Sequence, residues 1–124
     1  MKKVLMLASV ASMIDQFNRD NIAILEDMDF QIDVACNFEY GSSTSQERVQ
    51  QFKKELNQKN ISTFHVPMPR SITKIKDMFS SYKAVRNILN ENKYEIIHCH
   101  SPIGGVIARI ASRKARKRGS KVIY

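Results

Sequence analysis

The sequence lacks any apolar stretch long enough to span a bilayer. A spanning helix needs about 20 consecutive apolar residues, whereas the short apolar run at residues 4–8 is soon followed by polar Ser12, Asp15 and Gln16. We therefore interpret this run as a buried strand rather than as the core of a signal peptide. The expectation is a soluble protein, or one that is attached to a membrane only at its surface.

Glycine is scarce, and it is missing from the turn that follows the first expected strand, residues 8–13 (ASVASM). Dinucleotide sites need glycine in this turn because the backbone must approach the pyrophosphate closely. The glycine and lysine pattern of a P-loop is also absent. These absences argue against an NAD or FAD enzyme and against a nucleoside triphosphatase.

Acidic residues are outnumbered, with 12 Asp and Glu against 20 Lys and Arg and a net charge of +8. Such an excess of positive charge predicts an anionic partner. Nucleic acid is disfavoured as that partner, because no aromatic side chains that could stack on bases are interleaved with the basic clusters.

Short apolar runs alternate with helical periodicity along the 124 residues, which suffice for one compact domain. Strands are expected at residues 2–8, 31–36, 61–66, 95–99 and 121–124, and helices at 17–28, 46–59, 71–91 and 103–118. Strict alternation of strand and helix requires parallel strands joined by right-handed crossovers. The sequence therefore predicts an α/β fold, a Rossmann-like doubly wound parallel sheet with strand order 3-2-1-4-5.

The two cysteines, Cys36 and Cys99, each end an expected apolar strand, where cysteine usually behaves as a small buried hydrophobic residue. In the expected order these strands lie two spacings of about 4.8 Å apart. A disulfide needs Cα atoms within about 7 Å of each other. We expect two free thiols and a reducing, cytoplasmic setting.

The expected order places the first and fourth strands side by side at the switch point of the sheet, where ligands bind outside the carboxyl ends of the strands. The loops at residues 9–16 and 100–105 should face one another across one crevice. Ser101-Pro102 fits the start of a helix whose free N–H groups could hold an anion or sugar hydroxyls. The candidate acceptor- or substrate-binding residues are Ser9, Ser12, His100, Ser101, Gly104 and Gly105.

His98 and His100 are two residues apart and share one face of an extended strand. A zinc site would need a third and a fourth ligand, and no neighbouring Asp, Glu or Cys cluster supplies them. We therefore predict no metal site. We interpret His98 as a semi-buried strand residue and His100 as a hydrogen-bonding partner for a hydroxyl or a phosphate.

A basic amphipathic segment follows the third expected strand. Its candidate membrane-facing residues are Arg70, Ile72, Lys74 and Lys76. Such a segment can rest on anionic lipid, and it can equally be a solvated face. A second basic cluster, between residues 109 and 118, is also explained by stabilisation of a helix C-terminus.

Four stretches taken together resemble the family 4 glycosyltransferases, and in particular bacterial capsule and exopolysaccharide enzymes. They are residues 2–6 (KKVLM), 30–35 (FQIDVA), 94–102 (YEIIHCHSP) and 121–124 (KVIY). The likeness is to the N-terminal, acceptor-side domain of the family. It implies a GT-B architecture of two Rossmann-like domains. Residues 1–124 would belong to the first domain, and the sequence would end before that domain is complete.

The resemblance implies a retaining, metal-independent enzyme with no cofactor. A nucleotide-sugar would be the donor substrate, and the acceptor would be a glycan, often a polyprenyl-diphosphate-linked sugar. Such an enzyme would be cytoplasmic, peripheral on the inner face of the cell membrane, and would serve surface polysaccharide synthesis. The family's donor-binding domain and its paired glutamates lie beyond Tyr124, so the catalytic residues stay unknown and we expect this chain alone to be inactive.

Two alternatives remain open from the sequence. One is a stand-alone binding module for an anionic partner, and the other is part of a nucleotide-sugar epimerase with the GT-B fold. Many relatives also carry glycine in the first loop, where this chain has Ser9, Ala11 and Ser12. The fifth expected strand lies at the edge of the sheet. If it is unpaired there, it would allow a homodimer to form.

Overall fold

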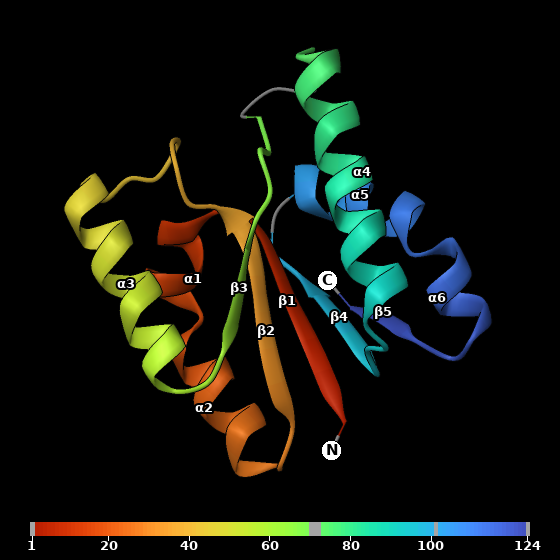
Figure 1. Cartoon of the computed structure of the whole chain (residues 1–124), viewed down its shortest axis with the longest axis horizontal. Coiled ribbons are helices and arrows are strands. Elements are labelled where there is room, and N and C mark those ends of the chain that lie inside the picture. The colour runs from red at the N-terminus through yellow and green to blue at the C-terminus, as the bar shows by residue number, and fades with distance from the viewer. Residues whose placement is uncertain (1, 70–72, 101, 124) are drawn as a thin grey trace.

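The structure is a computed structural model that describes residues 2–69, 73–100 and 102–123. Its centre is a sheet of five parallel strands in the order β3-β2-β1-β4-β5, which confirms the expected topology (Figure 1). The strands are β1 (Lys3–Val10), β2 (Gln31–Asn37), β3 (Ser62–His65), β4 (Ile96–Cys99) and β5 (Lys121–Ile123).

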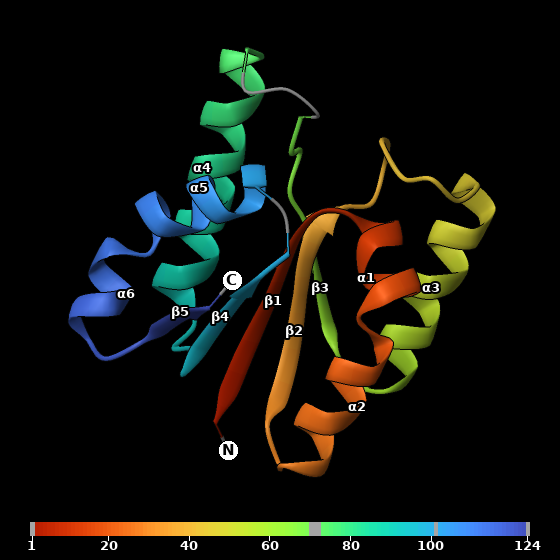
Figure 2. The same cartoon turned by 180° about the vertical axis from the view of Figure 1, so that it is seen from behind.

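Helices cover both faces of the sheet. They are α1 (Ala11–Phe17), α2 (Arg19–Asp27), α3 (Gln46–Gln58), α4 (Ile75–Glu91), α5 (Pro102–Ala111) and α6 (Arg113–Lys117). The first three helices lie on one face and the last three on the other, as both views show (Figures 1 and 2). Because the helix after β1 and the helix after β4 lie on opposite faces, the switch point falls between these two strands.

The core consists of two apolar layers, one on each side of the sheet. In β1, Leu5 and Leu7 belong to the layer under α4 and α5, whereas Met6 and Ala8 belong to the layer under α1, α2 and α3. All four side chains are fully buried. Continuous burial is characteristic of a parallel strand that is covered on both faces.

The first helical region differs from the expectation of a single helix over residues 17–28. Helix α1 already begins at Ala11, and Asn18 separates it from α2. The buried Asn18 side chain donates a hydrogen bond from Nδ2 to the Met13 carbonyl, 2.9 Å away. An asparagine that bonds the local backbone competes with helix propagation, which explains the break.

The helix expected over residues 103–118 is likewise divided, at the buried residue Ser112. Ser112 Oγ lies 3.4 Å from the Arg109 carbonyl, so this side chain also bonds the backbone of the preceding turn. In the described residues α4 begins at Ile75, later than the expected start at 71, and Lys74 precedes it. Both differences move boundaries and leave the order of elements unchanged.

A polar cluster lies near the amino ends of the strands. The Tyr94 hydroxyl donates a 2.6 Å hydrogen bond to Asp33 Oδ2, and the Lys3 ammonium lies 3.2 Å from the same oxygen. Asp33 is 1% exposed, so these two partners take the place of water around its carboxyl group. The cluster joins β1, β2 and the segment that enters β4.

Candidate functional site

The carboxyl ends of the strands, at the upper edge of the sheet in Figure 1, carry the polar residues selected from the sequence. The backbone N–H of His100 donates a 2.9 Å hydrogen bond to the Leu7 carbonyl, which ties the exit of β4 to β1. The pairing of β1 with β2 shifts register between Leu7 and Val10. The end of β1 that carries Ser9 is therefore irregular, and Ser9 itself is half-buried.

Ser12 fastens the loop after β2 to the start of α1. Its N–H donates to Ser42 Oγ at 3.2 Å, and its Oγ accepts from the N–H of Ser43 at 3.0 Å. The Ser43 hydroxyl also lies 3.1 Å from Gln16 Oε1. Ser12 is 3% exposed, so its hydroxyl has a structural role in shaping this edge of the sheet. A direct contact of Ser12 with a ligand stays a prediction.

Asn37, which the sequence analysis did not select, holds the same loop from the end of β2. Its Oδ1 accepts the backbone N–H groups of Glu39 at 2.9 Å and Tyr40 at 3.0 Å. Its Nδ2 donates to the Met68 carbonyl at 3.2 Å. A signal was present in the sequence, because an Asn directly after an apolar strand often closes a turn through its side chain.

The two histidines come together as their spacing predicts. The ring centroids of His98 and His100 lie 4.0 Å apart with a tilt of 55° between the ring planes. The Nε2 atom of His100 is buried and has no hydrogen-bond partner among the described residues. A buried polar atom without a partner costs free energy. Binding of a ligand group by Nε2 stays a prediction.

Both imidazoles are held in the neutral form near neutral pH. Burial lowers the pKa of His98. Burial, and then the nearby His98 ring, lower the pKa of His100 to about 4. A neutral imidazole can donate or accept a hydrogen bond but cannot form an ion pair. This environment favours contact with a hydroxyl or another uncharged polar group over a purely electrostatic contact.

The helix after β4 begins at Pro102, in agreement with the expected helix start. Gly104 and Gly105 lie in its first turn and are buried. The first N–H groups of a helix have no partner within the helix and can bind an anion or hydroxyls. Ser101, the expected N-cap, lies outside the described residues, so its role stays a prediction.

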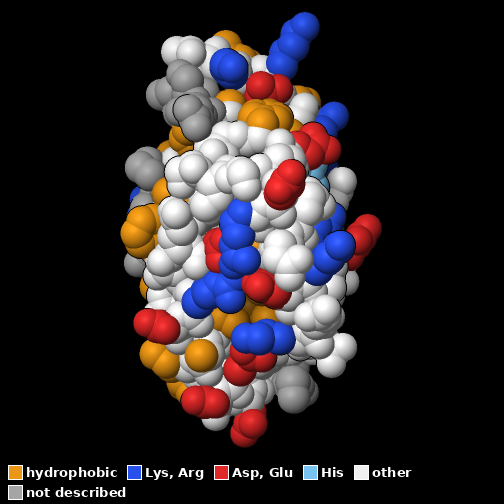
Figure 3. Space-filling view, turned by 90° about the vertical axis from the view of Figure 1, so that its left-hand side faces the viewer, with side chains coloured by type: hydrophobic (Ala, Val, Ile, Leu, Met, Phe, Trp, Pro, Cys, Tyr) orange, Lys and Arg blue, Asp and Glu red, His pale blue; other side chains and the backbone are white. Residues whose placement is uncertain are grey.

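The face of the molecule on the side of α3 shows acidic and basic side chains interspersed (Figure 3). Between α1 and α3, the Arg48 guanidinium binds both carboxylate oxygens of Asp15, each at 2.8 Å. Arg19 bonds Asp15 at 2.8 Å and Glu55 at 2.6 Å. Burial alone would raise the pKa of Asp15, but the hydrogen bonds from Arg48 and Arg19 outweigh it and hold this pKa below its usual range. The network joins α1, α2 and α3 and is structural.

Within residues 2–69, 73–100 and 102–123, no group of three or more His, Cys, Asp or Glu side chains is arranged to hold a metal ion. Both cysteines in this part are free and buried, as expected. Of the described helices, none has both the length and the hydrophobicity required to cross a membrane.

The candidate membrane-facing segment is only partly described, because Arg70 and Ile72 lie outside the described residues. Lys74 and Lys76 are exposed at the start of α4. Their apolar neighbours Ile75 and Phe79 are strongly exposed, at 76% and 56%. They are one turn apart on α4, a spacing that places them on the same side of the helix.

The five-stranded parallel order, the switch point between β1 and β4, and the polar residues at that edge define an α/β domain of the Rossmann-like class. The sequence matches the family described as "Glycosyl transferase 4-like" over residues 3–124. The chain belongs to this glycosyltransferase family.

Two curated relatives match part of the chain. EpsD of Bacillus subtilis (strain 168), a protein named as a glycosyltransferase, is 39% identical over 61 residues, which are 49% of this chain and 16% of EpsD. The UDP-Gal:alpha-D-GlcNAc-diphosphoundecaprenol alpha-1,3-galactosyltransferase of Escherichia coli is 40% identical over 57 residues, which are 45% of this chain and 14% of that enzyme.

Among solved structures, MurG of Acinetobacter baumannii has a TM-score of 0.62 at 13% sequence identity. The likeness covers 98% of this chain and 34% of the MurG chain. At this identity it shows the fold alone. The matched regions are thus a minor part of each relative's length.

Proposed function

We propose that this chain forms the acceptor-side half of a retaining glycosyltransferase that moves a sugar from a nucleotide-sugar to a lipid-linked glycan acceptor. The observation that carries this proposal is the family match over residues 3–124, which includes the whole polar edge of the sheet. The named activity of the E. coli relative, transfer from UDP-galactose to a diphosphoundecaprenol-linked sugar, supports the substrate class. We further propose a role in surface polysaccharide synthesis and a reaction that needs no metal and no cofactor.

The His100 environment supports a role in sugar binding. Among the described residues Nε2 of its neutral ring has no hydrogen-bond partner, and His100 stands two positions before the start of α5. Sugars present hydroxyls that both donate and accept hydrogen bonds, and a neutral imidazole can complement either role. We assign His100, Ser9 and the first turn of α5 to the edge that meets the transferred sugar or the acceptor.

The experiment compares this chain with a longer protein in which a donor-binding domain of the same family follows it. Each is incubated with a UDP- or GDP-sugar and a lipid-diphosphate-linked sugar, and the product is followed by mass spectrometry. We expect transfer only by the longer protein, with retained anomeric configuration by NMR and unchanged rate in a chelator. Interconversion of the nucleotide-sugar without transfer would instead indicate an epimerase.

The exposed apolar residues of α4 support peripheral attachment to an anionic membrane. Ile75 and Phe79 project from a helix start that also carries Lys74 and Lys76, and the Lys83 ammonium lies 4.8 Å from the centre of the Phe79 ring. Apolar side chains beside cations are the combination that binds the interface of anionic lipid. The attachment would bring the strand-end site near a lipid-linked acceptor.

A sedimentation assay with anionic vesicles tests the attachment. The double variant Ile75→Ser and Phe79→Ser should lose most vesicle binding. The matched control is Ile24→Ser with Met28→Ser, because this pair is also strongly exposed, at 56% on α2 and 61% at its C-cap. Equal loss in both variants, or loss in neither, would show that α4 is an ordinary solvated face.

A further inference from the structure

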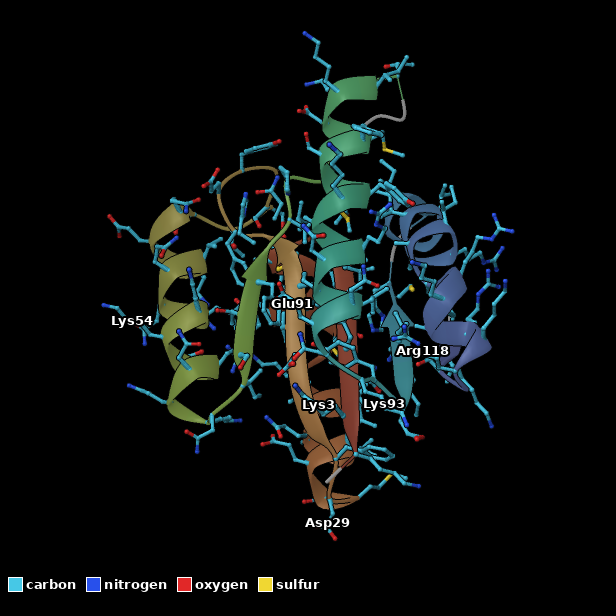
Figure 4. The ribbon with its side chains drawn as sticks, turned by 45° about the vertical axis from the view of Figure 1, so that its right-hand side comes forward. Lys3, Asp29, Lys54, Glu91, Lys93 and Arg118 are labelled. Atoms are coloured by element: carbon cyan, nitrogen blue, oxygen red, sulfur yellow. The ribbon has the colours of Figure 1, made fainter. Side chains whose placement is uncertain are left out.

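A pocket lies between α4 and the α5–α6 region, away from the carboxyl ends of the strands. Its volume is about 330 Å³. Tyr82, Ile110 and Ala111 form its apolar part. Figure 4 shows α4 in front with the α5–α6 region beside it, and Arg118 just beyond the end of α6. The pocket is thus a depression between helices on the outer face of the domain.

The charged residues of this pocket are all positive. They are Arg86, Arg113, Lys114 and Lys117. Within the described part of the chain none of them forms an ion pair. The Arg86 guanidinium instead lies over the Tyr82 ring, 5.9 Å from its centre.

On the other face of the domain, arginines form ion pairs with carboxylates. Arg19 and Arg48 are each paired with Asp15 and Glu55. Four cations gathered around one pocket without a carboxylate repel one another, and a concave surface concentrates their potential. The arrangement favours the entry of a ligand that carries negative charge.

The volume of the pocket limits the size of the ligand that can bind. Small-molecule sites occupy about 300–1,000 Å³, so this pocket is at the lower end of that range. A ligand that satisfies four cations in so little space must carry several negative charges on few atoms. Phosphate carries more negative charge per group than carboxylate, and guanidinium groups bind its oxygens in a bidentate manner. An acidic peptide spreads its charges along a chain and fits a short pocket less well.

We propose that this pocket binds a molecule with two or more adjacent phosphate groups. The phosphates would contact Arg86, Arg113, Lys114 and Lys117, and the apolar part of the ligand would lie against Tyr82 and Ile110. The ligand is a free diphosphate compound or the diphosphate group of a lipid, since both present the same chemistry to the pocket.

This site is distinct from the strand-end site. Helix α4 runs toward the amino ends of the strands, where Asn92, which follows its last residue, bonds the Lys3 ammonium at 3.1 Å. Arg86 therefore lies in the half of α4 that is remote from its start beside the carboxyl ends of the strands. Binding here requires no sugar transfer, so the test is independent of the proposed glycosyltransferase activity.

The test is calorimetric titration of the protein with inorganic pyrophosphate and with tripolyphosphate at one fixed ionic strength. The pocket variant carries Arg113→Glu and Lys117→Glu, both at exposed positions. The matched control carries Lys54→Glu and Lys59→Glu, which make the same change in net charge on the side of α3, where Lys54 points into solvent (Figure 4). Far-UV circular dichroism checks that both variants fold.

We expect the pocket variant to bind pyrophosphate at least about tenfold more weakly than the unaltered protein, as the loss of charge-assisted hydrogen bonds predicts. The control should change the affinity by less than about twofold. The neutral variant Arg113→Gln with Lys117→Gln should fall between them, and it also serves if the charge reversal prevents folding. Equal weakening in pocket and control variants, or no binding of either phosphate, would overturn the proposal.

A second arm separates the two sources of diphosphate. Phosphatidylcholine vesicles with and without a lipid diphosphate are sedimented with the protein, and pyrophosphate is added as competitor. Capture that depends on the lipid diphosphate, fails with the pocket variant and is reversed by pyrophosphate would assign the lipid source. Binding of free pyrophosphate without such capture would assign a soluble ligand. Capture only by vesicles of phosphatidylglycerol, unchanged in the pocket variant, would overturn the proposal in favour of a general membrane contact.

Discussion

The rings of His98 and His100 lie 4.0 Å apart between centroids, beside the switch point between β1 and β4. Two imidazoles at this separation cannot both be protonated without strong repulsion. Their proximity and their burial act in the same direction, because each lowers the pKa of His100. The pair therefore offers uncharged hydrogen-bonding groups at the polar edge of the sheet.

The first prediction concerns the titration of His100. Its pKa should be about 4, as measured from imidazole proton shifts by NMR between acid and neutral pH. The variant His98→Gln removes the repulsion from the neighbouring imidazole and should raise the pKa of His100. Burial should still keep this pKa below the ordinary value of about 6.5. A pKa for His100 at or above the ordinary value would contradict the described environment.

The second prediction concerns stability below neutral pH. The pKa of His100 is lower in the folded state than in the unfolded chain, so the unfolded chain takes up its proton first as the pH falls. The contribution of this group to stability is therefore complete above about pH 6.5 and is lost progressively as the pH falls toward 4.

The matched comparison for this effect is the variant His100→Gln. Urea unfolding at several pH values should show a smaller loss of stability from pH 7 to pH 4.5 in the variant than in the unaltered protein. Identical pH profiles would show that His100 titrates alike in the folded and unfolded states.

The third prediction concerns the buried Asp33. Tyr94→Phe removes the hydroxyl that donates to Asp33 and leaves this carboxylate with Lys3 as its charged partner. The loss should cost about 1–3 kcal/mol of unfolding free energy, because a buried acceptor is left less satisfied. Urea unfolding measures it. Tyr82→Phe, at a half-exposed residue of α4, is the control and should change stability by less than about 0.5 kcal/mol.

The fourth prediction concerns the thiols. Burial raises the pKa of Cys36 far above its ordinary range and that of Cys99 to about 11, the latter despite the nearby Arg109. A buried thiol that stays protonated reacts slowly with disulfide reagents. The folded protein should therefore react with Ellman's reagent hardly at all, and the unfolded protein should show two thiols. Rapid reaction of the folded protein would mean that the ends of β2 or β4 open to solvent.

Much of the fold could be predicted from the sequence because its signals are local. The apolar runs at β1 and β4 and the 3.6-residue period of α3 and α4 are local patterns. Strands that alternate with helices are joined by right-handed crossovers, and this rule leaves few possible orders of the strands in the sheet. The breaks at Asn18 and Ser112 were missed. Each depends on a side chain that turns back to bond the backbone of the preceding turn, and periodicity does not reveal that choice.

The site was predictable to the same extent. The proximity of His98 and His100 follows from their spacing in one strand. The contact of Tyr94 with Asp33 joins residues 61 positions apart, and the bond of Ser12 to Ser43 joins residues 31 apart. Such contacts depend on how the helices and loops pack, and a single sequence carries no local signal for them.

The polar edge between β1 and β4 is the part of the molecule that we propose to serve sugar transfer. The most direct measurement is the steady-state rate of transfer from a nucleotide-sugar by the longer protein, in the unaltered form and with His100→Ala. The control is Gln51→Ala, at an exposed position of α3. We predict that His100→Ala lowers kcat/KM at least about tenfold, as expected for the loss of a hydrogen bond to substrate, with unchanged folding and an unaffected control. Transfer at the same kcat/KM in all three proteins would show that His100 and this edge of the sheet take no part in transfer.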